Sequence, residues 1–125
     1  MKPTILGVTV LALVSSACLM DGFVFEVTDR RPIAAGESYA DWWSATEECS
    51  GRRGDFTRVR WYTASSITYD AVYARGVWLP PHDIVLLEGY EEHEPTTRHE
   101  MLHDLMDGDP HHESAEWTVC DLIDP

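Results

Sequence analysis

Residues 98–112 read RHEMLHDLMDGDPHH, and the periodicity of this stretch decides the expected fold. The preceding residues 95–97 are Pro-Thr-Thr; proline suits the first turn of a helix, and threonine is a good N-cap. Residues 108–110 (Gly-Asp-Pro) end the pattern, because glycine favours a helix terminus and proline cannot continue a helix. The sequence therefore predicts a capped helix over residues 96–107.

This helix contains an HExxH pattern formed by His99, Glu100 and His103. Side chains four residues apart lie one turn apart on the same helix face, so both imidazoles can reach one metal ion. The carboxylate on the adjoining face can take a proton from water held by that metal. Chance gives this pattern in about two or three of a hundred shuffled chains of this composition, so the helical context matters. The competing interpretation is a solvated helix with two incidental histidines.

A catalytic zinc ion needs a third protein ligand and keeps its fourth position for water. The turn at residues 108–110 can bring His111 or His112 back to the metal, and the residues alone leave that choice open. The competing interpretation of these two histidines is an exposed polar pair. Three carboxylates are further candidates for the third ligand: Asp107, Asp109 and Glu113.

Other side chains allow a functional and a structural interpretation. Asp104 and Asp107 could orient a ligand imidazole, although solvated helix carboxylates are the simpler expectation. Tyr90 either stabilises an oxyanion or packs as an aromatic residue. We expect His82 and His93 at the surface. Four tryptophans are expected in the core: Trp42, Trp43, Trp61 and Trp78.

The first residues have the order of an export signal. Lys2 precedes an apolar run at residues 5–14, and small residues then lead to Cys18. This order predicts a signal peptide over residues 1–17, with a buried core helix as the alternative. Val-Ser-Ser-Ala-Cys also looks like a lipobox, at which bacterial lipoproteins are cut and acylated on the cysteine; ordinary cleavage after Ala17 fits as well. We expect an exported protein of the cell envelope, either lipid-anchored in a membrane or free in the periplasm or medium.

Cysteine number and charge limit the function further. If Cys18 carries lipid, Cys49 and Cys120 remain, and an exported protein would oxidise them to one disulfide. The alternative is two buried free thiols. The net charge of −13 argues against nucleic acid or anionic lipid binding to the protein surface. The 125 residues fit one domain, which we expect to be a monomer.

The remaining elements are predicted from periodicity. Residues 38–49 have helical spacing, with Trp42, Ala45, Thr46 and Cys49 on one face. Residues 111–125 look irregular. Strands are expected near residues 23–28, 56–63, 67–79 (with a break at Arg75-Gly76) and 84–88.

Taken together, these parts resemble small bacterial lipoproteins assigned to the zinc metallopeptidases of the HExxH, zincin-like type. Their pattern joins a lipobox, a tryptophan-containing segment that leads to a cysteine, and a terminal HEMLH, Gly/Asp turn, histidine, aromatic and cysteine. The matching parts of this chain are Trp42-Trp43 through Cys49, residues 99–103, Gly108-Asp109, His112, Trp117 and Cys120. The resemblance implies that His99, His103 and His112 bind Zn²⁺, that Glu100 is the base, and that Cys49 pairs with Cys120.

The expected fold is α+β: a small zincin-like domain over residues 36–125, with a mostly antiparallel sheet, an N-terminal helix and the HExxH helix. Residues 18–35 would form an N-terminal anchor or linker with a first strand. The expected activity is zinc-dependent hydrolysis of a peptide or protein substrate, held by strand addition at residues 84–88. The alternatives are a non-catalytic zinc-binding envelope lipoprotein and a metal-free structural lipoprotein.

Overall fold

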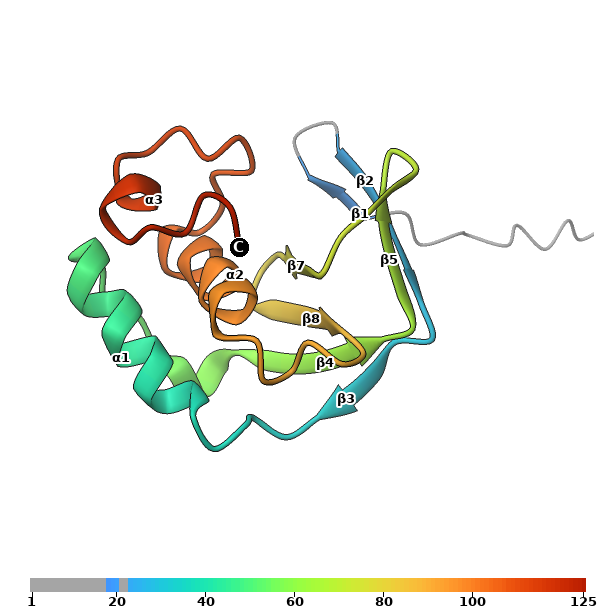
Figure 1. Cartoon of the computed structure of the whole chain (residues 1–125), viewed down its shortest axis with the longest axis horizontal. Coiled ribbons are helices and arrows are strands. Elements are labelled where there is room, and N and C mark those ends of the chain that lie inside the picture. Colours follow the sequence, from blue (N-terminus) through green and yellow to red (C-terminus); the bar gives the residue numbers. More distant parts are fainter. Residues whose placement is uncertain (1–17, 21–22) are drawn as a thin grey trace, which may run out of the picture.

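The computed structural model describes residues 18–20 and 23–125 (Figure 1). The predicted signal peptide, residues 1–17, lies outside the described residues, as does the side chain of Cys18. The elements in chain order are β1 (Cys18–Met20), β2 (Phe23–Thr28), β3 (Arg31–Ile33), α1 (Tyr39–Ser50), the 3-10 turn η1 (Phe56–Arg58), β4 (Arg60–Ala64), β5 (Ser66–Tyr69), β6 (Val72–Tyr73), β7 (Gly76–Leu79), β8 (Asp83–Leu87), α2 (Glu94–Met106) and α3 (Glu116–Val119).

A single antiparallel ribbon runs through two sheets and bends in its middle. β2 pairs with β5 and β3 pairs with β4, and the two ladders share one register. Thr28 lies opposite Ser66, and Arg31, three residues later, lies opposite Thr63, three residues earlier in the partner. At the bend Asp29 takes a positive φ of 54°. On one side of the bend, β2 and β5 belong to a first sheet of order β1-β2-β5-β6. On the other side, β3 and β4 belong to a second sheet of order β3-β4-β8-β7 (Figure 1).

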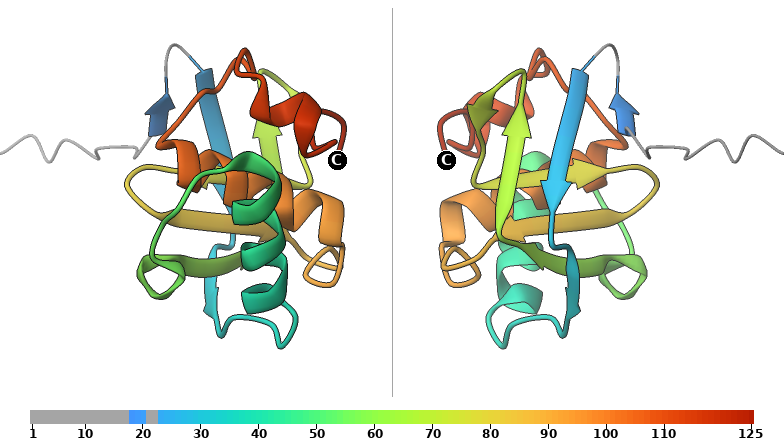
Figure 2. Two further views of the ribbon diagram at one scale, coloured as in Figure 1. Left: turned by 90° about the vertical axis from the view of Figure 1, so that its left-hand side faces the viewer. Right: turned by 90° about the vertical axis from the view of Figure 1, so that its right-hand side faces the viewer.

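The second sheet lies between two apolar layers, which explains why its strands are apolar on both faces. On β8, Ile84 and Leu86 pack with residues of α1 and α2, whereas Val85 packs on the other side with Ile67 of the first sheet. Successive side chains of a strand point to opposite faces, so burying both faces removes the apolar/polar alternation. The helices therefore cover one face of the second sheet, and the first sheet packs against the other (Figures 1 and 2).

The α+β expectation is confirmed, but the chain forms two sheets where one was expected. Five of the six pairs among the described strands are antiparallel; β4 and β8 run parallel. The predicted strand at 67–79 is interrupted twice. Asp70 and Ala71 have φ values of 46° and 63° and turn β5 back into β6, and the chain then crosses to the second sheet as β7.

The predicted substrate-binding edge strand is wrong. Residues 83–87 form β8, which pairs with β4 on one side and with β7 on the other, so its backbone groups are already bonded. The edge position next to β8 belongs to β7. An apolar run identifies a buried strand but does not fix the order of strands, which long-range pairing decides.

Both long helices lie close to their predicted positions, with different details. α2 has proline in its first turn as expected, but His93, and not a threonine, is its N-cap residue. The buried side chains of α1 are Tyr39, Trp43 and Thr46, so Trp42 is only half-buried. The described residues contain no helix that is both long enough and apolar enough to cross a bilayer.

Candidate metal centre

Three imidazoles converge beside the second half of α2. Nε2 of His112 lies 3.0 Å from Nε2 of His99 and 3.1 Å from Nε2 of His103. We call these three residues the histidine cluster; one donor atom from each lies within 4.8 Å of the others. Two of the rings come from successive turns of α2, and the third arrives from the turn that follows the helix. His99 and His103 therefore point towards one centre, as the spacing predicted.

Backbone carbonyls fix which nitrogen of each α2 histidine carries a proton. Nδ1 of His99 lies 2.5 Å from the carbonyl oxygen of Leu122, and Nδ1 of His103 lies 2.8 Å from that of Gly108. A carbonyl can only accept, so each Nδ1 must donate and each Nε2 keeps a free lone pair. Such outer contacts hold ligand imidazoles in one tautomer and orientation.

Burial keeps these imidazoles unprotonated. Desolvation lowers the pKa of His99 to about 4 and that of His103 to about 3, and it also lowers the pKa of His112. Near neutral pH the Nε2 atoms of His99 and His103 therefore each offer a lone pair. His112 can take either tautomer: with its proton on Nε2 it donates to one of the other two rings, and with its proton on Nδ1 it completes a set of three nitrogen ligands for a metal ion.

A short turn brings His112 into the cluster and leaves His111 outside it. His112 has a φ of 54°, a left-handed conformation that histidine adopts more readily than most residues. The Asp109 carboxylate organises this turn by accepting bonds from the backbone N–H groups of Glu113 (3.2 Å) and Ser114 (3.0 Å). It also accepts the indole N–H of Trp117 at 2.7 Å. Burial raises the pKa of Asp109, but these bonds outweigh burial and lower it to about 2.

Trp117 forms the floor beneath the histidine cluster. Its ring centroid lies 4.7 Å from that of His99, 4.6 Å from that of His103 and 4.5 Å from that of His112. The side chain is fully buried and packs with Leu102 in a small core of its own. A rigid aromatic floor restricts the rings that rest on it, so α3 contributes to the geometry of the cluster.

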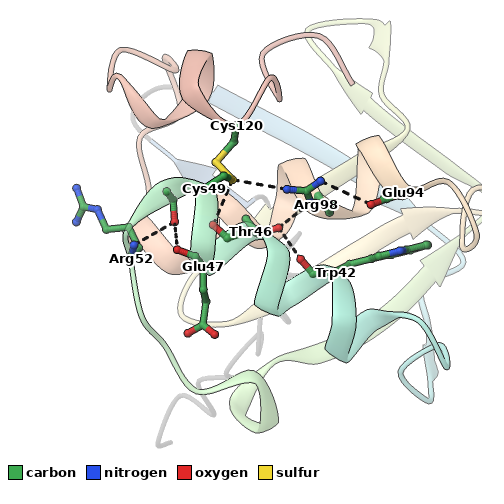
Figure 3. The surroundings of a disulfide bond; sticks show 9 residues. Trp42, Thr46, Glu47, Cys49, Arg52, Glu94, Arg98 and Cys120 are labelled. Atoms are coloured by element: carbon green, nitrogen blue, oxygen red, sulfur yellow. Dashed lines mark hydrogen bonds and ion pairs between the residues drawn. A yellow bond between two sulfur atoms is a disulfide. The ribbon is translucent and has the colours of Figure 1, made fainter.

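A disulfide holds this floor against α1. Cys49 at the end of α1 bonds Cys120, which directly follows α3 (Figure 3). The pairing implied by the resemblance is therefore present. Arg98 strengthens the same contact, because its Nε donates to Thr46 Oγ1 at 2.9 Å and its Nη2 lies 3.6 Å from Cys49 Sγ. The residue before His99 thus ties α2 to α1 beside the disulfide.

Glu100 lies next to the cluster and is held from the side of β7. Its side chain is 5% exposed, and burial raises its pKa to about 8, although the backbone N–H of Trp78 donates to it and lowers the value in part. Gly76 makes room for the carboxylate: a Cβ there would lie 3.1 Å from Glu100 Cγ and 3.3 Å from its Oε1. The glycine thus allows the strand backbone to pass directly over this side chain.

The free edge of β7 faces this carboxylate. The carbonyl of Arg75 accepts the N–H of Leu87 at 2.8 Å, which makes these two residues a hydrogen-bonded pair. Hydrogen-bonded pairs alternate along an antiparallel ladder, so residues 77 and 79 bond inwards and Gly76 and Trp78 present their backbone groups outwards. The Trp78 N–H is the group that reaches Glu100.

Two pockets meet at the histidine cluster and share Gly76, His99, Glu100 and His112. The first has a volume of about 190 Å³ and continues along apolar side chains such as Val77 and Pro110. The second has a volume of about 350 Å³ and continues towards Tyr73 and Arg75. Glu100 is therefore buried but lines open space on both sides of the cluster, where a bound chain could pass.

Several other predicted roles differ from what the structure contains. His111, Asp107 and Glu113 are exposed and do not belong to the histidine cluster. Asp104 was expected in solvent but is fully buried, and it bonds Trp78 and His82 instead of a cluster imidazole. His82 and His93, which were expected at the surface, are half-buried, and Tyr90 packs edge-on against His93. Trp43, Trp61 and Trp78 lie in the core as expected.

Sequence reasoning missed the parts of the site that act through the backbone. These are the carbonyls of Gly108 and Leu122, the N–H of Trp78 and the missing side chain of Gly76. Backbone donors and acceptors have no signature in the sequence. The break expected at Arg75-Gly76 was the one available signal, since glycine inside a strand pattern often marks a close approach.

The cluster suits zinc by its donors and their spacing. Three neutral imidazole nitrogens are ligands that zinc prefers, and tetrahedral ligands at zinc distances lie about 3.3 Å apart, close to the 3.0 and 3.1 Å that separate His112 Nε2 from the other two rings. Similarity to known proteins adds no information: no family model, no curated protein and no solved structure matches the chain.

Proposed function

We propose that this protein is a zinc-dependent peptidase in which His99, His103 and His112 hold the metal and Glu100 is the general base. One observation carries the proposal: a buried carboxylate and three convergent imidazoles line the same pocket, and Glu100, His99 and His112 also line a second pocket beside it. Zinc bound there would polarise a peptide carbonyl and lower the pKa of a water molecule towards neutrality.

Glu100 has the properties of a residue that takes and returns a proton near neutral pH. Burial raises its pKa to about 8 in the metal-free protein. A general base acts best when its pKa lies near the working pH, and a nearby cation would lower this value towards that range. The Trp78 N–H holds the carboxylate at the pocket wall, so it can take a proton from water and deliver it to the leaving amine.

The substrate would bind as an extended chain along β7. The backbone groups of Gly76 point to the free edge and are available for strand addition. The two pockets extend from Gly76 in opposite directions, which suits side chains on either side of the bond to be cleaved. The same features support a zincin-like relationship, in which an edge strand lies beside the metal-binding helix.

The proposal includes export and acylation of Cys18, in keeping with the resemblance to small lipoproteins. The Cys49–Cys120 disulfide supports an oxidising compartment, and it uses both cysteines other than Cys18. Mass spectrometry of the protein isolated from its native membrane would detect a diacylglycerol adduct on Cys18.

The test is to measure zinc in the purified full chain and to assay a denatured protein substrate with and without Glu100→Gln. We expect zinc at one ion per chain in both forms, and a loss of cleavage of at least about a hundredfold in the variant. Glu94→Gln is the matched control, because it makes the same chemical change at an exposed position of the same helix.

The outcomes separate the alternatives. Bound zinc with cleavage that does not depend on Glu100 would refute the assigned base. Bound zinc without any cleavage would favour a non-catalytic zinc-binding protein. A folded chain that binds no zinc would leave a structural envelope protein.

A further inference from the structure

Three side chains of α2 form a stripe that faces β7. Thr96, Glu100 and Asp104 are spaced by one helical turn, and none is more than 5% exposed. Residues 96 and 100 lie under Gly76, and Asp104 lies under the indole of Trp78. Four helical residues rise about 6 Å and two strand residues rise about 6.7 Å. Side chains one turn apart on α2 can therefore lie opposite every second residue of β7 over this contact.

The bond between Asp104 and Trp78 fixes this alignment. The indole N–H donates to Asp104 Oδ1 at 2.9 Å, and the bond is fully buried. His82 Nδ1 lies 2.9 Å from the same oxygen, and Arg58 Nη2 lies 3.5 Å from Oδ2, which has no hydrogen-bond partner among the described residues. A carboxylate held this deeply gives one low-energy position for the indole, because moving the indole would leave its own buried N–H without the acceptor it has here.

The same stretch of β7 also lies against Glu100, four residues before Asp104. A Cβ at Gly76 would lie 3.3 Å from Glu100 Oε1, and the backbone N–H of Trp78, two residues further along the strand, is directed at the same carboxylate. We infer that Asp104 is a positioning residue for Glu100: through Trp78 it sets the strand–helix alignment that points one backbone N–H at the catalytic carboxylate. This inference rests on the proposed function for its kinetic consequence only, because the alignment itself can be measured without activity.

The experiment compares Asp104→Ala with Asp104→Asn in the full chain. The asparagine keeps an oxygen that can accept from the Trp78 indole, whereas the alanine removes it. The matched control is Asp83→Ala, because Asp83 is also a buried carboxylate of the same region, but it pairs with Arg30 and Arg60 and not with the Trp78 indole. This control shows what the loss of a buried ion pair does by itself.

Two measurements decide the inference. In the zinc-free protein, hydrogen exchange at the Trp78 amide, relative to the Val85 amide of the same sheet, should be at least about tenfold faster in Asp104→Ala. It should be unchanged in Asp104→Asn and in Asp83→Ala. In the zinc-loaded protein, kcat should fall by about ten- to a hundredfold in Asp104→Ala with KM and zinc content nearly constant, and Asp104→Asn should restore it.

Two results would overturn the inference: an unchanged exchange ratio in Asp104→Ala, or an equal loss of kcat in Asp83→Ala. If the unmodified chain cleaves no peptide at all, the proposed function fails, and the exchange ratio still decides whether Asp104 fixes the strand. The two failures can therefore be told apart.

Discussion

Replacing Cys49 and Cys120 by serine is expected to lower the free energy of unfolding by about 4 kcal/mol at 25 °C. The disulfide joins residues 71 positions apart, and closing a loop of this length in the unfolded chain accounts for that value in the chain-entropy model. Small domains are stable by only about 5–15 kcal/mol, so the change is a large part of the total. It corresponds to a fall in Tm of roughly 15–30 °C.

The same replacement should weaken zinc binding. Cys120 lies between Trp117, the floor of the histidine cluster, and Leu122, whose carbonyl holds Nδ1 of His99. Without the disulfide this segment is free to move, and the tautomer and orientation of His99 are less well fixed. Loss of such outer contacts typically costs about ten- to a hundredfold in metal affinity.

The assay is urea unfolding followed by tryptophan fluorescence, with a chelator present and Cys18 left in place in every form. The unmodified chain treated with a phosphine reductant is the control, because it breaks the same bond without changing a side chain. Both reduced and substituted forms should give the same lower stability. A difference below about 1 kcal/mol, together with unchanged zinc affinity, would refute the view that this bond holds the floor of the site.

Further expected outcomes follow from individual side chains. His112→Ala should abolish stoichiometric zinc binding, measured by titration against a zinc-sensitive dye, whereas His111→Ala should retain it. Zinc binding that survives in His112→Ala and is lost in His111→Ala would show that His111, and not His112, is the third ligand. Gly76→Ala places a methyl group 3.1 Å from Glu100 Cγ and should lower cleavage about tenfold with zinc content unchanged, which a peptidase assay with metal analysis would check. The zinc-free protein should lose stability as pH falls from about 6.5 towards 4. The unfolded chain protonates the two α2 histidines below 6.5, whereas burial holds their pKa at about 4 and about 3 in the folded chain, so the unfolded state binds more protons in this window. Each histidine contributes a slope of about 1.4 kcal/mol per pH unit, and a flat profile of stability against pH in urea unfolding would contradict their burial.

The sequence by itself determined the local parts of this protein. The spacing of His99 and His103 places both imidazoles on one helix face because helical geometry is set by neighbouring residues. The strands predicted near 23–28 and 84–88 and the helix predicted over 38–49 lie within one residue of β2, β8 and α1 for the same reason. The pairing of Cys49 with Cys120 also agreed with a count of the cysteines.

Only the tertiary structure decided which strand lies at the sheet edge and which histidine completes the cluster. β7 is an edge strand because, among the described strands, it pairs only with β8, whereas β8 pairs with β7 and with β4. The pairing of β8 with β4 joins segments that are far apart in the chain. His112 reaches the cluster because Asp109 ties its turn to Trp117, a contact that the spacing of residues does not reveal. Backbone groups and buried carboxylates such as Asp104 stayed hidden for a related reason: their partners come from other elements, and only folding brings them within hydrogen-bond distance.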